Sequence, residues 1–432
     1  MPRLDYKQKD FRQQLETFCA GASAQAEVVQ TVSEILSDVR LRGDLAVAYY
    51  TAKFDHAKLT SKQMRISPEA LEKAAAALPP TARKALEEAT KCIRDFHKKT
   101  VPQSWEHTNP HGARVGERFS PIQRCALYIP GGQVPLVSTV LMTAIPAQLA
   151  GVPQLVACTP PQPNGQVNAA MLAAFHHCGI QEVYAIGGIQ AIGALAYGTE
   201  TIRAADKIFG PGNAYVCEAK RQVFGRVGVD LLPGPSEVMV IADTTAHADW
   251  AAADLLAQAE HGTGKEKVYL LVTDIKTRAD IEHAIEVQLT SLTHAAKIRA
   301  VLEKNFCSIL LPGLAQAAEI ANYIAPEHLE LQVEEKEVSR LAKQITTAGA
   351  ILLGHHSPTV LGDFTAGPSH TLPTGRAGRF FSGLQVSDFM RRTSLVEYTP
   401  ESLKKAAGVV AAFSAMEQLD AHGRSLTIRL EK

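Results

Sequence analysis

Short apolar runs alternate with helical stretches along the chain after Arg124, and this alternation limits the fold more than any other feature. Strands that alternate with helices are typical of parallel sheets, because a parallel connection needs a long crossover that is usually helical. The sequence of 432 residues therefore predicts an α/β protein, and its length favours two or three domains. The runs that we expect to form strands are 125–129, 154–158, 182–186, 206–209, 237–242, 267–272, 308–311 and 349–353.

Both ends of the chain read mostly as helix. In roughly the first hundred residues, apolar residues recur three and four apart over 33–50 and 68–97. Near the other end, Thr399 can cap a helical segment that extends, with or without a break, to Ala421 or His422, where Gly423 would stop it. A terminal segment of this kind often docks on a neighbouring domain or subunit.

Charge and cysteine content exclude several classes of protein. Lys plus Arg equals Asp plus Glu at 44 each, so no bulk positive field would attract nucleic acid or an anionic membrane. The N-terminus bears charges of both signs and no apolar core, unlike a secretory signal. The 7 cysteines are dispersed and odd in number, which favours reduced thiols and a cytoplasmic location. We therefore expect a small-molecule partner.

One long stretch without Lys, Arg, Asp or Glu lies between Arg124 and Glu182. Pro130, Pro135 and Pro146 interrupt it, so no uninterrupted apolar segment of about 18 residues remains to span a membrane. A buried strand–helix–strand unit explains the composition better.

Glycine and proline cluster just after three of the predicted strands, where ligands bind in open α/β sheets. The usual dinucleotide fingerprint, Gly-x-Gly-x-x-Gly followed by an acidic residue, is absent. The bare backbone amides of Gly187 and Gly188, or of Gly210 and Gly212, could still hold a pyrophosphate at a helix start. Ordinary strand–helix turns are the more common explanation of such loops.

Gln258 and His261 lie three residues apart near the C-terminal end of a predicted helix over 249–261, which Gly262 would stop. This spacing puts both side chains on one face. A neutral imidazole is a good zinc ligand and an amide oxygen a weaker one, and the partial negative charge of a helix end favours a cation. The more common alternative is a polar helix end that faces water.

Two further places carry chemistry-bearing side chains. Glu327 and His328 are adjacent in a turn and could supply two proton-transfer groups. Asp363, with His370 nearby, could give a hard carboxylate ligand. Taken singly, a surface turn before a strand and a capped turn explain these residues better.

In this order, the motifs together resemble the histidinol dehydrogenase family over nearly the whole chain. The stretches that carry the resemblance are 128–132, 209–216, 233–237, 258–261, 324–330, 362–363 and 417–422. Several of these are uncommon strings, so chance is a poor explanation.

The resemblance implies a role for particular residues of this chain. One zinc ion per subunit would be held by Gln258, His261, Asp363 and His422. Glu327 and His328 would form the acid–base pair. NAD would contact Tyr128, Gln190 and Asn213. The substrate, L-histidinol, would contact Ser236, Gln258, His261, His328, Asp363, Glu417 and His422.

The resemblance also implies an architecture: two incomplete Rossmann-like α/β domains with parallel sheets, plus small N- and C-terminal helical segments. Residues 1–25 would form an N-terminal arm, and 26–128 with 236–380 a first domain that carries most of the zinc and catalytic site. Residues 129–235 would form the NAD-binding domain. Members of the family are similar in forming homodimers, so the segment 381–432 would reach the neighbouring subunit, where His422 would complete the metal site.

The activity implied is oxidation of L-histidinol through L-histidinal to L-histidine, in two hydride transfers to NAD at the end of histidine biosynthesis. Two positions depart from the commonest family pattern: Thr359 follows Pro358 where Glu is frequent, and Ser369 stands where Asn is frequent. A dehydrogenase of the same fold that acts on another amino or sulfonated alcohol therefore stays open. A zinc hydrolase in which Glu327 activates water is a further alternative, but no His-Glu-x-x-His motif supports it.

Overall fold

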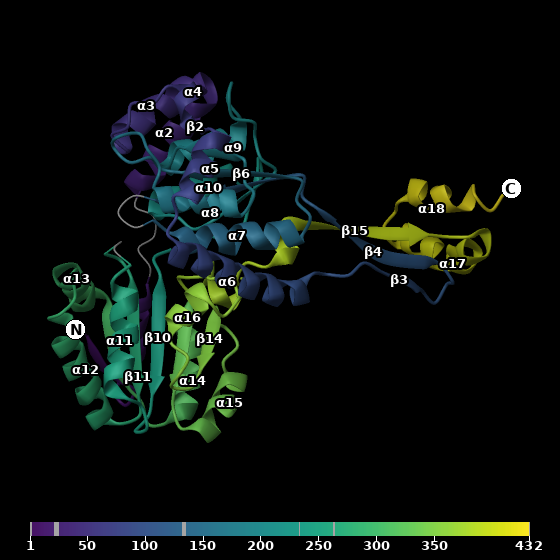
Figure 1. Cartoon of the computed structure of the whole chain (residues 1–432). Coiled ribbons are helices and arrows are strands. Elements are labelled where there is room, and N and C mark those ends of the chain that lie inside the picture. The colour runs from purple at the N-terminus through teal and green to yellow at the C-terminus, as the bar shows by residue number, and fades with distance from the viewer. Residues whose placement is uncertain (1, 21–25, 132–134, 233, 262–263, 432) are drawn as a thin grey trace.

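The structure, a computed structural model, describes residues 2–20, 26–131, 135–232, 234–261 and 264–431. It contains two α/β units, one stacked on the other, and an arm that projects to the side (Figure 1). The first unit is built on one sheet of six strands and the second unit on another, while the arm contains a sheet of three. The predicted α/β class with parallel sheets is therefore confirmed.

The first unit has the strand order β2-β7-β6-β5-β8-β9, in which only β2 runs antiparallel to its neighbour. Its strands are β2 (Arg65–Ile66), β5 (Arg124–Tyr128), β6 (Gln154–Thr159), β7 (Glu182–Ala185), β8 (Lys207–Phe209) and β9 (Gly228–Val229). Its helices are α2 (Ala26–Arg42), α3 (Asp44–Phe54), α4 (Ser61–Met64), α5 (Pro68–Ala76), α6 (Pro80–His97), α7 (Val137–Leu149), α8 (Ala169–His177), α9 (Gly188–Tyr197) and α10 (Ala214–Val223).

The second unit has the order β1-β12-β11-β10-β13-β14, with all neighbours parallel. Its strands are β1 (Arg3–Asp5), β10 (Glu237–Ala242), β11 (Lys267–Val272), β12 (Phe306–Leu310), β13 (His328–Gln332) and β14 (Ala350–Leu353). Its helices are α1 (Phe11–Cys19), α11 (Ala248–Ala259), α12 (Ile275–Leu289), α13 (Ala295–Asn305), α14 (Leu314–Ile324), α15 (Glu335–Gln344) and α16 (Thr359–Phe364).

The arm joins two segments that are far apart in the sequence. Its antiparallel sheet has the order β15-β4-β3. The elements are β3 (Trp105–Thr108), β4 (Arg114–Pro121), β15 (Met390–Glu397), α17 (Pro400–Met416) and α18 (Asp420–Thr427). No local pattern in the sequence predicts this sheet, because β4 ends at Pro121 and its partner strand β15 begins only at Met390.

All eight predicted strands are present, within one or two residues of the expected bounds. The helix predicted over 33–50 is instead broken at Gly43, whose φ of 52° no helix interior adopts, so α2 and α3 are separate. Thr399 does cap α17, accepting a hydrogen bond from the Ser402 N–H. Gly423 does not stop the last helix, since α18 continues through it to Thr427.

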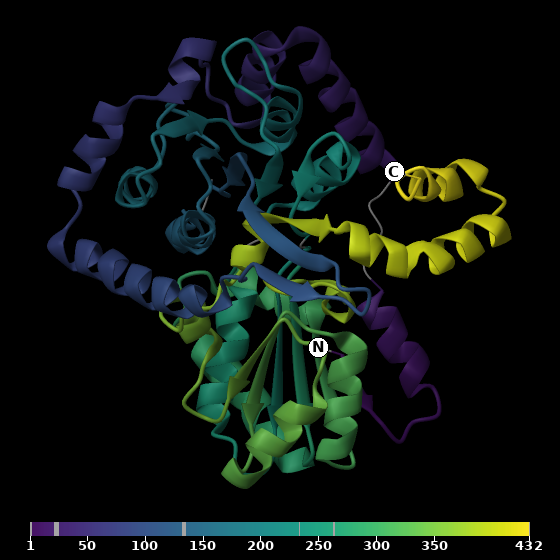
Figure 2. The ribbon, with the colours of Figure 1, turned by 90° about the vertical axis from the view of Figure 1, so that its right-hand side faces the viewer.

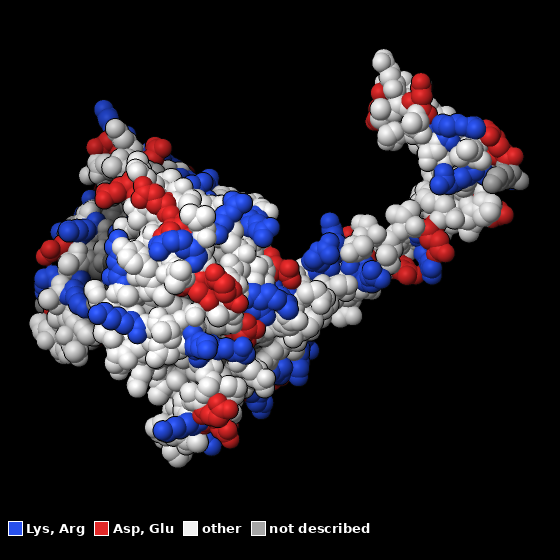
Figure 3. Space-filling view, turned by 90° about the horizontal axis from the view of Figure 1, so that it is seen from above, with Lys and Arg blue, Asp and Glu red and all other residues white. Residues whose placement is uncertain are grey.

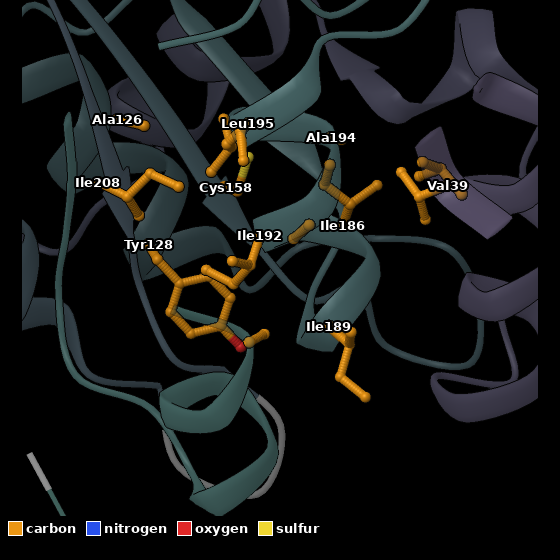
Figure 4. Packing of buried hydrophobic residues seen from close by; sticks show 14 of the residues in the cluster. Val39, Ala126, Tyr128, Cys158, Ile186, Ile189, Ile192, Ala194, Leu195 and Ile208 are labelled. Carbon is orange, nitrogen blue, oxygen red and sulfur yellow. The ribbon is translucent and has the colours of Figure 1, made fainter. Parts of the chain in front are cut away.

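The expected division of the chain differs from the observed packing and strand pairing. The family resemblance predicts that 26–128 belongs with 236–380, whereas β5 is a central strand of the first unit. The apolar face of α2 packs on α9, where Val39 lies so close to Gly193 that an added Cβ would be 3.1 Å from it. The physical reason is that α2 has one apolar face to bury, and the first sheet and its helices supply the matching surface (Figure 4).

The two terminal segments also differ from expectation. The expected N-terminal arm over 1–25 contributes β1, which pairs with β12 at the edge of the second sheet, whereas 1 and 21–25 lie outside the described residues. The C-terminal segment over 381–432 forms a sheet with β4. Hydrogen bonding of an otherwise open strand edge explains both placements.

Charges of both signs are intermixed over the face seen in Figure 3, as the equal totals of acidic and basic residues led us to expect. Among the described helices, none has both the length and the apolar character that crossing a membrane requires.

Candidate active site between the two units

The predicted acid–base pair lies at the amino edge of the second sheet, where β13 begins. Pairing of β10 with β13 sets Val238 opposite His328, so Glu237 lies beside Glu327. The backbone N–H of Glu237 donates to Oε2 of Glu327 over 2.9 Å, and both residues are buried. Ligands of open α/β sheets usually bind at the carboxyl edge, so sequence reasoning did not anticipate this placement.

Burial makes the uncharged forms of Glu327 and His328 the stable ones. It raises the pKa of the Glu327 carboxyl well above its usual range, and the carboxylates of Glu237 and Asp363 add to the rise. Burial lowers the pKa of His328 to about 3, with His370 acting in the same direction. Nδ1 of His328 lies 3.8 Å from Oε2 of Glu327 and has no hydrogen-bond partner among the described residues. A protonated carboxyl and a neutral imidazole thus lie side by side, which suits proton transfer.

Asp363 and His370 connect this pair to the first unit. Oδ1 of Asp363 lies 3.7 Å from Nε2 of His328 and 3.9 Å from Nδ1 of His370. The same His370 nitrogen lies 3.2 Å from the backbone oxygen of Asp363, while Nε2 of His370 forms a hydrogen bond of 3.1 Å with Oγ1 of Thr139. Because Thr139 lies in the first turn of α7, a continuous series of contacts joins the first unit to His328.

Gln258 and His261 lie at the end of α11, next to this group. Burial raises the pKa of the Asp363 carboxyl to about 6, and the charge of His261 opposes the rise, which indicates that the two side chains are close. Gln258 is buried one turn before His261, and its Nε2 has no hydrogen-bond partner within the described ranges. Gly262, the expected helix stop, lies outside the described residues, and α11 ends at Ala259.

Glu417 and His422 lie apart from this group, on the arm. Both are exposed, Glu417 just after the end of α17 and His422 within α18. Figure 2 shows these helices projecting beyond the two units. Over the described part of the chain, which omits 262 and 263, no three His, Cys, Asp or Glu side chains are arranged to hold a metal ion. Within a single chain, Glu417 and His422 are therefore not part of the group around Asp363.

The loops after β5 and β8 lie at the carboxyl edge of the first sheet, on either side of the point where strand order reverses. At Gly210, with φ 115°, a Cβ would collide with the backbone oxygen of Tyr128. Nζ of Lys220 donates to the Gly210 oxygen over 2.9 Å, and Oδ2 of Asp230 accepts from the Gly210 N–H over 2.7 Å. Lys220 and Asp230 are fully buried and paired with each other, so a buried ion pair holds this loop in place.

Two of the three predicted NAD contacts are already engaged within the protein. The Tyr128 ring lies among apolar side chains (Figure 4), and its hydroxyl accepts from the N–H of Gly188 over 3.2 Å. Gln190 is buried beside it and donates to Oδ2 of Asp55 over 3.3 Å, while its Oε1 has no partner among the described residues. Asn213 is exposed and caps α10 by accepting from two first-turn N–H groups. The hydroxyl of Tyr128 thus contacts the start of α9, which carries Gln190, and Asn213 lies beyond the end of the neighbouring strand, β8.

A cleft of about 1260 Å³ separates the two units on one side of the buried pair. Its lining includes Ala214 and Leu231 of the first unit and Glu237 and Lys267 of the second. Oε2 of Glu237 has no hydrogen-bond partner among the residues described. Burial raises the pKa of Glu237 to about 7, so this carboxyl group also takes up a proton readily.

Several residues that shape the site were not singled out from the sequence. Glu237 lies in the stretch 233–237, which carries part of the family resemblance, so the sequence does mark it as a candidate site residue. Asp55, Lys220 and Asp230 carried no local signal, because their partners are brought to them only by folding. In the sequence His370 is only a near neighbour of Asp363, and its contact with Thr139 arises on folding.

Comparison with known proteins decides the family. The sequence model described as histidinol dehydrogenase matches residues 20–430. A histidinol dehydrogenase of Ruegeria pomeroyi is 44% identical over 436 residues, covering 100% of this chain and 99% of the relative. One from Gluconobacter oxydans is 42% identical, with 100% of each chain covered. This chain belongs to the histidinol dehydrogenase family.

A solved structure of the histidinol dehydrogenase family extends the likeness to the fold. The crystal structure of histidinol dehydrogenase from Elizabethkingia anophelis superposes with a TM-score of 0.93 at 36% sequence identity, covering 100% of this chain and 98% of that one. The resemblance inferred from the motifs is therefore confirmed, and so is the α/β fold class.

The Gly210 loop generates a prediction on stability for this member of the histidinol dehydrogenase family. Gly210→Ala should lower the free energy of unfolding by about 1–3 kcal/mol more than Gly225→Ala, because the new methyl group meets fixed backbone. Gly225 is the matched control, since its φ is also positive, at 95°, but nothing lies within 4 Å of an added Cβ. Urea denaturation measures both, and equal losses would show that the contact with Tyr128 does not restrict the loop.

Proposed function

We propose that this protein oxidises L-histidinol through L-histidinal to L-histidine, with NAD as oxidant and one zinc ion per subunit. The observation that carries the proposal is the contact of buried, uncharged His328 with both Glu327 and Asp363 at the junction of the two units. His328 as base, Glu327 as acid and Asp363 as a hard ligand suit the oxidation of an alcohol to an aldehyde, followed by addition of water to that aldehyde. Family membership gives this chemistry its substrate class.

The zinc part of the proposal rests on the donor atoms. Gln258, His261 and Asp363 offer the nitrogen and oxygen donors that zinc takes. The amide of Gln258 has a buried atom without a partner, and because the O and N of an amide are interchangeable by a flip, this atom fits a ligating oxygen. When bound, zinc would hold the imidazole and amine of the substrate and so orient the carbon that reacts.

The NAD part rests on the loops of the first unit. The loops after the paired strands β5 and β8 bring glycine backbone near the start of α10, and a helix start attracts a pyrophosphate. Tyr128, Gln190 and Asn213 border this region, and the unpartnered Oε1 of Gln190 is free to accept a hydrogen bond. NAD supplies the hydride acceptor for each oxidation.

The residues of the chain would handle protons and position. His328, neutral because it is buried, takes the proton of the substrate hydroxyl while a hydride leaves the same carbon. Water then adds to the aldehyde, with Glu327 exchanging a proton with it, and gives the hydrate. A second hydride leaves the hydrate and its hydroxyl proton passes to the pair, which yields the carboxylic acid. The pair releases each proton to solvent before it accepts the next, so the formation of the acid consumes one water and yields two hydrides and two protons, which balances the reaction.

The decisive experiment is to follow NADH formation with L-histidinol in metal-stripped protein before and after zinc is restored. We expect zinc-dependent formation of about two NADH per histidinol, because each oxidation delivers one hydride. If NADH forms with a different amino or sulfonated alcohol but not with histidinol, the NAD-linked oxidation of an alcohol stands and L-histidinol is rejected as the substrate. Turnover of an ester or amide without NAD would favour the hydrolase alternative.

His328→Asn and Glu327→Gln should each lower kcat by about 10²- to 10⁴-fold, the range of general acid–base catalysis, because neither new side chain transfers a proton. Gln keeps the shape of Glu, and Asn places an amide where the imidazole ring begins; neither residue is among the proposed zinc ligands, so bound zinc should stay stoichiometric by elemental analysis. The control is His283→Asn, an exposed histidine on α12, which should leave kcat unchanged. Full activity of either site variant would remove that residue from the mechanism.

We further propose that the enzyme is a homodimer in which the arm of one subunit completes the site of the other. His422 and Glu417 are exposed and lie outside the group around Asp363. The arm also exposes large apolar side chains, such as Val396 (69%) and Met416 (68%), which a second copy would cover. In this arrangement His422 of the partner subunit supplies the fourth zinc ligand, and Glu417 of the partner subunit faces the substrate ammonium.

Mixing two inactive variants tests this sharing. Glu327→Gln damages the body of a subunit and His422→Ala its arm, so a heterodimer should contain one intact site. After unfolding together and refolding, random pairing should restore about a quarter of wild-type activity. The matched control mixes Glu327→Gln with Asp363→Ala, both in the body, and should restore none. Absence of recovery in the first mixture, with heterodimers detected, would contradict the sharing of sites.

A further inference from the structure

A buried polar network lies one layer behind the proposed zinc site, between α11, β13 and α16. Its centre is Glu330, which is 1% exposed. Oε1 of Glu330 accepts two hydrogen bonds of 2.7 Å, from the N–H and from Oγ1 of Thr359 at the start of α16. Oε2 of Glu330 accepts from Nε2 of Gln332 over 3.2 Å. These bonds tie β13 to α16.

Asp254 ties the same carboxylate to α11. Its carboxyl is hydrogen-bonded to Glu330, and its Oδ2 accepts from Nε2 of Gln332 over 2.9 Å. Burial raises the pKa of Asp254 to about 8, and the charge of Glu330 adds to the rise. Asp254 thus holds a proton at neutral pH and donates it to Glu330, since two ionised carboxylates in contact would repel each other. The result is one hydrogen-bonded acid pair that spans three elements.

Asp254, Thr359 and Glu330 each lie one helical turn, or two strand residues, from a residue of the proposed site on the same element. Asp254 precedes Gln258 by four residues on α11, and Thr359 precedes Asp363 by four on α16, so each pair shares a helix face. On β13, Glu330 and His328 are two residues apart and point to the same face of the sheet. Four residues of helix and two of strand both span roughly 6 Å. The network therefore forms a layer at a nearly constant depth behind the site.

We propose that the Asp254–Glu330 pair is a positioning element that fixes the spacing of α11 and α16 and thereby presents Gln258 and Asp363 to the metal at the right separation. This inference rests on the proposed zinc site. Residues that orient metal ligands through hydrogen bonds are known to affect affinity strongly without touching the metal. Here the pair acts on the backbone of the ligand-bearing elements instead of on the ligands themselves.

The test compares the zinc affinity of full-length variants by competition with a chromogenic chelator. Asp254→Ala removes the bond between α11 and Glu330 and should weaken zinc binding by about 10- to 100-fold, the usual effect of losing a supporting partner. Asp254→Asn keeps it, because the amide donates to Glu330 and accepts from Gln332, so its loss should stay below the low end of that range. Asp249→Ala, an exposed carboxylate at the start of the same helix, should bind zinc as the wild type does.

Thermal unfolding of the metal-free proteins separates positioning from general damage. The proposal is supported if Asp254→Ala binds zinc more weakly, if Asp254→Asn restores the binding, and if the Tm of each metal-free variant stays close to that of the metal-free wild type. Unchanged zinc affinity in Asp254→Ala would overturn the inference, as would equal weakening in Asp254→Asn. If the wild-type protein itself binds no zinc, the proposed metal site fails and this inference with it, an outcome distinct from loss in one variant.

Discussion

The parallel pairing of β10 with β13 is the contact on which the rest of the site depends. Its register places the N–H of Glu237 against the carboxyl of Glu327 and starts β13 at His328. Both strands are buried on both faces, so the two side chains are removed from water by the same pairing that positions them. A shift of one residue would turn His328 to the opposite face of the sheet.

Removal from water determines the protonation of the whole group. A buried carboxylate or imidazolium is unfavourable without a counter-charge, so Glu327 keeps its proton and His328 stays neutral. One layer deeper, burial and the charge of Glu330 raise the pKa of Asp254 to about 8. At the Gly210 loop the solution is a full ion pair, Lys220 with Asp230. At this loop, buried polar groups hold the backbone in place through the Gly210 N–H and oxygen.

The position of the site also follows from how the two sheets face each other. Ala214 and Leu231, which follow the carboxyl ends of β8 and β9, line one side of a cleft, and Glu237, which lies beside the acid–base pair at the amino edge of the second sheet, lines the other. The contact of Thr139 with His370 bridges the two units. This arrangement explains why loops and acid–base residues that are more than a hundred positions apart in sequence can serve one reaction.

The sequence by itself determined the strands, the α/β class and the family. Apolar runs and glycine turns are local patterns, and the uncommon strings around Tyr128, Gly210 and Glu327 identify a family without any reference to packing. Those patterns did not give the grouping of α2 with the first sheet, the sheet of the arm, or the supporting roles of Asp55, Asp254 and Lys220. Each of these depends on which surfaces meet, and a long-range contact between buried groups leaves no periodic trace in either segment. Only the tertiary structure decided these features. The charge and position of a side chain depend on how deeply it is buried and on which groups it contacts, and residue type alone does not determine either.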